Sequence, residues 1–251
     1  ISVSLGACQS SFLQQPLALD QDDLVKLMEN KDCPGCNLVG ADLSGMSLEG
    51  SDLSFSNLQG ARLRGTDLRR ARLRGAKLTE ADFSGADLLD ANLEETDLEG
   101  AQLTGANLRG VELWNSNLRS AKLRGTSLEE ASLRDSRMEG ADLSGAVLFE
   151  ANLDEANLTG VNLNAADLRE VKMRRTNLTN VKMEGTDLNY AKLCGTILPD
   201  GEVPENNRRY QINAKRGLST DILHESWREF VQYHVSSDFW GEVVAKLGPA
   251  I

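Results

Sequence analysis

The chain has 251 residues, a net charge of -11, 26% charged residues and only 5% aromatic residues. The negative charge argues against nucleic-acid phosphates as the main partner, and no apolar run approaches the ~18 residues that would span a bilayer. With 22 Gly and few aromatic residues, a core must consist of Leu and small side chains. The length allows one large domain or two smaller ones.

Residues 1–18 form an N-terminal segment that we expect to be extended or disordered. The chain begins at Ile1 rather than Met, so we expect a processed or trimmed form. Leu5 to Cys8 resemble the processing box of a bacterial lipoprotein, but no apolar segment precedes them.

Residues 19–35 predict a helical cap at the start of the fold. Asp20 is the expected N-cap, and acidic residues follow it in the first turn. Leu24, Leu27 and Met28 give an apolar stripe at helical spacing. We expect this stripe to cover the first layer of the domain that begins after residue 35.

Cys33 and Cys36 form a C-x-x-C pair directly after this helix. A zinc site would need two more soft ligands, and the chain has no second pair. The pair therefore predicts a local disulfide or two free thiols at a turn, and a disulfide would indicate an oxidising compartment. The sequence assigns no role to Cys8 or Cys194.

An uninterrupted period of five residues runs from Leu38 to Leu198. Of its 33 positions, 29 are Leu, three are Met and one is Phe83. A small residue usually stands two positions before each of them, and Gly often stands two positions after. This period fits neither a helix at 3.6 nor a strand at 2.

We infer that each five-residue unit is one side of a square coil. The Leu and the small residue point inward, and the Gly-rich position lies at the corner, where unusual backbone angles are tolerated. Four units make a coil of twenty residues, so residue n lies over residue n+20. Coils would stack at about 4.8 Å, the spacing of hydrogen-bonded strands.

Units such as ADLSG at 41–45 and 141–145 and ANLDE at 151–155 resemble the pentapeptide repeat family, whose pattern is A(D/N)Lxx. The resemblance implies an all-β solenoid over residues 36–200. Its fold would be a right-handed quadrilateral β-helix of about eight coils, with a short N-terminal α-helical cap and a C-terminal α-helical segment.

Residues 61–78 carry seven basic side chains and look like a nucleic-acid patch when read alone. The stack by twenty instead predicts a layer of an inter-coil charge ladder. The expected pairs are Arg62 with Asp42 and Asp82, Arg69 with Glu49, Arg70 with Asp90, Arg72 with Asp52, Arg74 with Glu94, and Lys77 with Asp97.

Residues 201–218 read as a polar linker, and residues 219–251 predict C-terminal helices at about 219–234 and 236–248. They would cap the last coil or contact a partner or a second copy of the chain. The candidate contacts there are Trp227, Phe230 and Trp240.

No set of residues is arranged for catalysis. His224 and His234 are ten residues apart, and the sequence has no phosphate-binding loop or HExxH metal motif. We therefore expect no catalytic residue, no cofactor and no metal ligand.

Two surface features remain. An acidic ridge would occupy two neighbouring corners and would either meet a cation or basic partner or extend into water; it consists of Glu95, Glu130, Asp135, Glu150, Glu155 and Glu170. Outward apolar side chains are either scattered or one protein contact, and they are Leu89, Trp114 and Phe149.

These patterns favour a non-enzymatic scaffold that docks to a protein partner or a larger, membrane-associated complex, without direct nucleic-acid binding. The C-x-x-C and the acidic composition resemble periplasmic or thylakoid-lumen family members from cyanobacteria, which implies an extracytoplasmic location, with a cytoplasmic one as the alternative. The alternative function, which some family members have, is inhibition of a type II topoisomerase by DNA mimicry.

Overall fold

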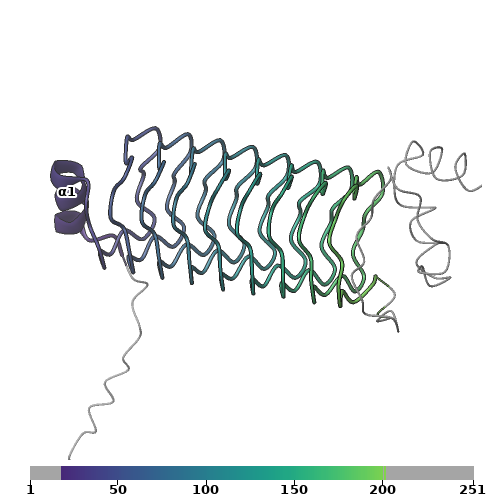
Figure 1. The fold of residues 1–251 in the computed structure, drawn as a ribbon. Helices are drawn as coiled ribbons and strands as arrows, with labels where there is room; N and C mark the ends of the chain where they lie inside the picture. The colour runs from purple at the N-terminus through teal and green to yellow at the C-terminus, as the bar shows by residue number, and fades with distance from the viewer. Residues whose placement is uncertain (1–17, 200, 202–251) are drawn as a thin grey trace, which may run out of the picture.

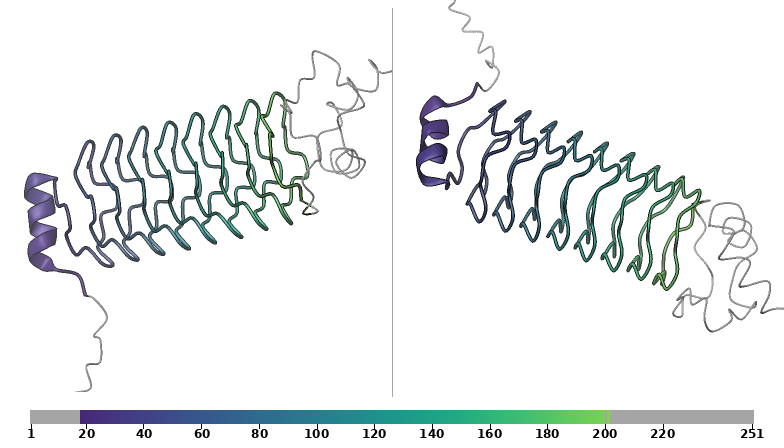
Figure 2. Two further views of the ribbon diagram at one scale, coloured as in Figure 1. Left: turned by 60° about the horizontal axis from the view of Figure 1, so that its bottom comes forward. Right: turned by 90° about the horizontal axis from the view of Figure 1, so that it is seen from above.

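The computed structural model describes residues 18–199 and residue 201. One helix, α1 (Gln21–Asn30), lies across the first end of a straight rod of stacked coils (Figures 1 and 2). The predicted linker at 201–218, apart from residue 201, and the predicted helices at 219–251, with Trp227, Phe230 and Trp240, lie outside the described residues, as do residues 1–17 and residue 200.

Isolated parallel β-bridges, rather than extended strands, hold the coils of the described part together. They join residues twenty apart, and eight successive bridges connect Asn37 to Ile197. Four such columns of bridges run along the rod, so each coil has four sides. The five-residue period therefore predicted the stack of n over n+20 correctly, and eight steps of about 4.8 Å give a rod about 38 Å long.

A tight turn closes each side of the coil. The backbone N–H of Ala41 donates to the carbonyl of Leu38 at 3.1 Å, and Gly40 between them has φ +66°. A positive φ at the third residue is the mark of a type II turn and explains the Gly at many corners. Non-glycine residues adopt this conformation too, among them Phe55 at +59°. The bond from the Phe55 N–H to the carbonyl of Arg74, at 2.9 Å, helps to hold that corner.

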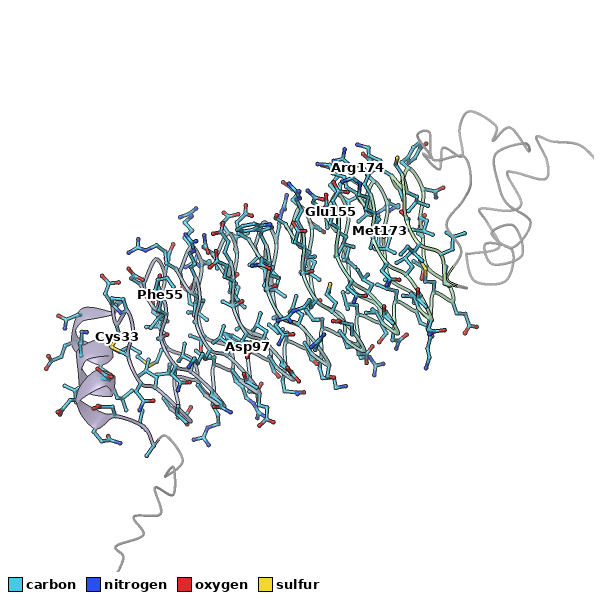
Figure 3. All side chains as sticks on the ribbon, turned by 90° about the horizontal axis from the view of Figure 1, so that it is seen from below. Cys33, Phe55, Asp97, Glu155, Met173 and Arg174 are labelled. Carbon is cyan, nitrogen blue, oxygen red and sulfur yellow. A yellow bond between two sulfur atoms is a disulfide. The ribbon has the colours of Figure 1, made fainter. Side chains whose placement is uncertain are left out.

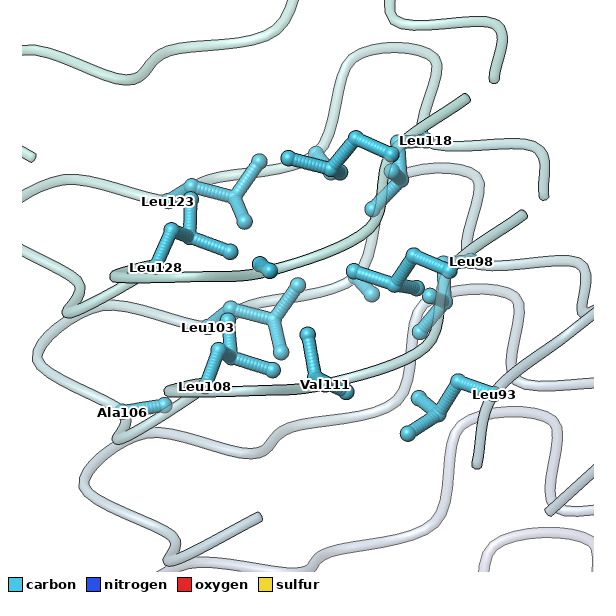
Figure 4. Packing of buried hydrophobic residues seen from close by; sticks show 14 of the residues in the cluster. Leu93, Leu98, Leu103, Ala106, Leu108, Val111, Leu118, Leu123 and Leu128 are labelled. Atoms are coloured by element: carbon cyan, nitrogen blue, oxygen red, sulfur yellow. The ribbon is translucent and has the colours of Figure 1, made fainter. Parts of the chain in front are cut away.

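The core is a column of stacked leucines on each side of the rod. Figure 4 shows Leu98, Leu103 and Leu108 of one coil beneath Leu118, Leu123 and Leu128 of the next, and all six are buried. Burying one Leu contributes roughly 1.5–3 kcal/mol before the loss of chain entropy is counted. Small residues fill the spaces between the columns because a larger side chain would push neighbouring coils apart.

Buried hydroxyls replace Ala at several inward positions, where backbone carbonyls accept their hydrogen bonds. Thr126 Oγ1 donates to the carbonyl of Leu123 at 2.7 Å, and Thr186 Oγ1 donates to the carbonyl of Leu163 at 2.8 Å. These bonds explain why Ser and Thr are compatible with the dry interior. By contrast, Ser51 Oγ is buried without a hydrogen-bond partner in the structure.

The helix α1 begins where the sequence predicts. Asp20 is the N-cap, and its Oδ1 accepts the N–H groups of Asp22 and Asp23 at 2.9 and 3.3 Å. Leu27 is fully buried against the first coil. The expected stripe was wrong at Met28, which is 63% exposed, because a helix lying on a flat coil end buries only a narrow face.

The charge ladder is confirmed for four of the expected cations. Their ion pairs are Arg62–Asp42 at 2.9 Å, Arg69–Glu49 at 3.1 Å, Arg72–Asp52 at 3.1 Å and Arg74–Glu94 at 3.8 Å. Each joins side chains one coil apart. The basic run therefore belongs to the rod's own architecture.

Three expected pairs were wrong. Arg70 turns toward Glu49 at 3.6 Å and not toward Asp90, because a side chain at a left-handed corner can lean along the rod in either direction. Asp82 pairs with Arg64 instead of Arg62. Within the described residues Lys77 has no ion pair with Asp97, whose carboxylate accepts from Thr79 and Asn117.

Hydrogen bonds from Arg62 and then from Ser44 lower the pKa of Asp42 from 3.8 to about 2. The same contact raises the pKa of Arg62. The ionised carboxylate is therefore the form that the folded rod favours.

We expect the variant carrying Arg62→Glu and Arg74→Glu to unfold at a lower temperature than the wild type, by a few degrees. The variant loses ion pairs and faces Asp42 and Glu94 with like charges. Thermal unfolding followed by circular dichroism at low ionic strength measures the shift. Arg124→Glu is the control, because this exposed arginine has no ion pair in the described residues.

Acid provides a second check. A carboxylate with a depressed folded pKa stabilises the fold above its ordinary pKa of 3.8 and loses this effect as the pH falls through about 2. The difference between variant and wild type should therefore shrink toward pH 2. An equal difference at pH 2 and pH 7 would contradict the ladder as its cause.

Candidate functional site

The turn residues that follow Leu53 and every twentieth residue after it stack into one corner of the rod. We call this the Trp114 corner, and its turn positions are 54–55, 74–75, 94–95, 114–115, 134–135, 154–155, 174–175 and 194–195. Their side chains point away from the Leu column, so this corner is free to vary in sequence without disturbing the core.

The two exposed large apolar side chains of the described coils both lie on this corner. Phe55 is 66% exposed and Trp114 is 40% exposed. The Phe55 ring lies over Gly75, where a Cβ would come within 2.6 Å of the ring carbons. The Trp114 indole N–H donates to Asp135 Oδ2 at 3.1 Å, which fixes the ring one coil below that carboxylate.

A cavity of about 360 Å³ opens on the same corner, nearer the C-terminal end of the described rod. Three guanidinium groups, two carboxylates and one thiol line it, and they belong to Arg134, Asp154, Glu155, Arg174, Arg175 and Cys194. Figure 3 shows Glu155 and Arg174 together on this side of the rod. Successive coils supply these residues, because 134, 154, 174 and 194 form one column.

A buried carboxylate holds the centre of the cavity in place. Asp154 accepts the Arg174 backbone N–H on Oδ1 at 2.8 Å, and its Oδ2 accepts Nε and Nη2 of Arg174 at 2.9 and 2.6 Å. These contacts raise the pKa of Arg174, so its guanidinium stays charged. Glu155 meets Arg175 at 3.5 Å, a looser contact.

The predicted acidic ridge occupies two corners. Glu95, Asp135 and Glu155 belong to the Trp114 corner, and Glu130, Glu150 and Glu170 stack on the preceding corner. Several are already engaged: the contacts are Glu95 with Arg74 at 2.8 Å, Glu130 with Arg109 at 2.7 Å, Glu155 with Arg175, and Asp135 with Trp114. Glu150 and Glu170 are exposed and form no ion pair within the described residues.

Leu89, Phe149 and Trp114 do not form one patch. Leu89 and Phe149 are half-buried in a column where Arg109 and Glu129 stand between them. The Arg169 guanidinium lies 5.5 Å from the centre of the Phe149 ring and covers part of it. Trp114 stands on a different corner.

In the structure a disulfide joins Cys33 and Cys36, whose Cα atoms are 5.4 Å apart, between α1 and the first coil. Both are buried, Lys26 Nζ lies 3.8 Å from Cys36 Sγ, and the Asp23 carboxylate is nearby. Asp23 Oδ2 accepts the Asn37 N–H at 2.8 Å, so it helps to anchor the helix. If the disulfide were reduced, Asp23, Cys33 and Cys36 would offer three ligands, which is one fewer than a structural zinc site needs.

Sequence reasoning missed Phe55 and the cavity. Phe55 could have been found as an aromatic residue in a column otherwise rich in Gly and charged residues. Writing the sequence in rows of twenty also brings Arg134, Asp154 and Arg174 together, but it does not show that a cavity opens between them.

Among the described residues, the structure contains no helix with the length and hydropathy of a membrane span.

Comparison with known proteins gives a consistent family assignment. The model of the family described as pentapeptide repeats matches in eight copies, over residues 36–75, 56–88, 86–125, 126–164 and 162–198. A search of curated proteins found no match.

Three solved structures illustrate the likeness. HetL, a pentapeptide repeat protein involved in heterocyst differentiation regulation from Nostoc sp. strain PCC 7120, is 30% identical, covers 74% of this chain and 100% of its own, and has a TM-score of 0.24. QnrB1, a plasmid-mediated fluoroquinolone resistance protein, is 22% identical over 65% of this chain and 86% of its own, with a TM-score of 0.40. A thylakoid-lumen pentapeptide repeat protein from Arabidopsis thaliana is 28% identical over 55% of this chain and 71% of its own, with a TM-score of 0.19. Because the family model matches well over half of its residues, the chain belongs to the pentapeptide repeat family.

Proposed function

We propose that this protein is a non-enzymatic scaffold that binds a protein partner or a larger, membrane-associated complex. The observation that carries the proposal is the exposure of two separate aromatic side chains, Phe55 and Trp114, on a single corner of a rigid rod, three coils apart with the Arg74–Glu95 pair between them. Large aromatic side chains held in place outside the core are common at the centre of protein interfaces.

The construction of the rod supports this role. Backbone hydrogen bonds tie every described coil to its neighbours, so the corner presents its side chains at a fixed spacing of about 4.8 Å per coil. A partner that matches this spacing binds without having to order the scaffold first. Pentapeptide repeat proteins are in general structural or binding modules, which is consistent with such a role.

The pairing of charges weighs against DNA mimicry. A DNA mimic needs a continuous negative surface, but arginines one coil away neutralise Glu95 and Glu130. Residues 36–199 also contain 19 basic against 25 acidic side chains, interleaved along the rod.

We also propose an extracytoplasmic location, in a periplasm or a thylakoid lumen. The buried Cys33–Cys36 bond supports it, because such bonds persist in oxidising compartments.

Trp114→Ala is expected to lower partner recovery at least tenfold when the full chain is used as bait in extracts of the native source, since a truncated central aromatic removes a large part of the binding energy. Quantitative mass spectrometry after crosslinking measures recovery. Phe149→Ala is the matched control from the other column, and Glu130→Lys with Glu150→Lys tests the ridge. Unchanged recovery in both Trp114→Ala and the ridge variant would argue against these contacts.

A gyrase supercoiling assay tests the competing function. We expect no inhibition at high micromolar protein, because the acidic side chains of the rod are interleaved with paired arginines. Inhibition that disappears in the Glu130→Lys and Glu150→Lys variant would instead favour DNA mimicry.

The disulfide has its own test. Protein taken from its native compartment, denatured and alkylated without reduction should carry no label on Cys33 or Cys36, whereas protein reduced before alkylation should carry two, and denaturation is needed because both side chains are buried in the fold. Replacing both with Ser should destabilise the fold by about 2 kcal/mol, since the closed loop is short. Cys194→Ser is the control, and full labelling without reduction would refute the proposed oxidised state.

A further inference from the structure

Cations dominate the outer surface around the cavity of the Trp114 corner, although the whole chain is acidic. The side chains of Arg174 and Arg175 are 59% and 76% exposed, whereas that of Asp154 is only 7% exposed. Arg134 is exposed as well, and Lys172 and Lys192 stand on the adjoining side of the coil. Glu155 and Asp135 are the acidic groups that share this surface.

The three guanidinium groups keep hydrogen-bond donors in reserve. Each has five N–H donors. Arg174 uses Nε and Nη2 on Asp154, and Arg175 reaches Glu155 through Nη1 alone. Arg134 makes no ion pair with any described carboxylate. The buried Asp154 fixes Arg174, so part of the site is ordered before a ligand arrives.

The cavity begins within two coils of Trp114 on the same corner. Trp114 lies one coil from Arg134 and two coils from Asp154, which corresponds to about 5 and 10 Å at the coil spacing. An extended peptide advances about 3.3 Å per residue, so about three residues would cover the longer distance. The cavity of about 360 Å³ is at the small end for ligand sites and suits a side chain.

We propose that this cavity binds a carboxylate side chain from an acidic segment of a partner protein, while Trp114 covers an apolar side chain about three positions away. The proposal rests on the scaffold function and specifies the chemistry of its partner. Arginine forks match carboxylates in a bidentate manner. Glu155 in the lining and Asp135 beside the cavity would repel a continuous row of phosphates more strongly than the one or two carboxylates of a short acidic segment.

The test uses the full chain with Trp227→Phe and Trp240→Phe, so that Trp114 is its one tryptophan. The probe is a capped nine-residue peptide with a Leu three positions before a Glu-Asp pair. We expect a saturable change in tryptophan emission with a dissociation constant at or below about 100 µM. The same peptide with Gln-Asn should bind at least tenfold more weakly.

Arg134→Gln with Arg175→Gln should weaken binding of the acidic peptide at least tenfold. The matched control is Arg124→Gln with Arg137→Gln, which removes two exposed charges elsewhere and should leave binding unchanged. Equal binding of both peptides, no saturable binding, or no effect of the cavity variant would each overturn the proposal. Tighter binding of inorganic polyphosphate or duplex DNA than of the acidic peptide would overturn it in favour of a phosphate ligand.

Peptide binding and partner recovery together distinguish a failure of the cavity proposal from a failure of the scaffold proposal. If the peptide fails to bind but Trp114→Ala still lowers partner recovery, the cavity assignment is wrong and the scaffold stands. If neither responds, both are wrong.

Discussion

The backbone hydrogen-bond ladder between residues twenty apart is the constraint on which the rest of the molecule depends. It fixes each coil above the last, and it requires every coil to have the same length. An insertion of one residue would move inward Leu side chains to the outside, so the period of five admits no interruption between Leu38 and Leu198. Packing of the buried Leu side chains then stabilises the coils that these hydrogen bonds align.

The backbone of all five residues of a unit takes part in turns or in bonds between coils, as Phe55 N–H does with the carbonyl of Arg74. The core uses the side chains of the Leu and the small residue, so the side chains of the two turn positions are left for other purposes. Left-handed turns hold those positions at the corners, and both exposed aromatic side chains of the coils lie there. Phe55 is held in a left-handed backbone conformation that favours glycine. A glycine at this corner would relieve the strain but would lack the exposed ring. The exposed aromatic side chains and the lining of the cavity therefore both lie at turn positions, outside the packed core.

The sequence predicted backbone relations better than side-chain ones. The stack by twenty and four ion pairs follow from period and register alone, and the Asp20 cap follows from the preference of Asp for the N-cap position before an acidic first turn. The partner of Arg70, the exposure of Met28 and the cavity did not follow from the sequence. The partner of Arg70 and the cavity depend on side-chain torsions beyond Cβ, and the exposure of Met28 depends on how much of α1 the flat end of the first coil covers. Arg70 has acidic residues one coil away on either side, and the period cannot say which one it chooses.

Charge pairing also explains how an acidic protein can present a basic site. Where a carboxylate lies at the surface beside an arginine, as Glu95 does beside Arg74, the two cancel toward solvent. Where the carboxylate is buried beneath the arginine, as Asp154 is beneath Arg174, the positive group faces outward. The same pair of residue types thus neutralises one part of the corner and makes another part attractive to anions, and the depth of the acid decides which.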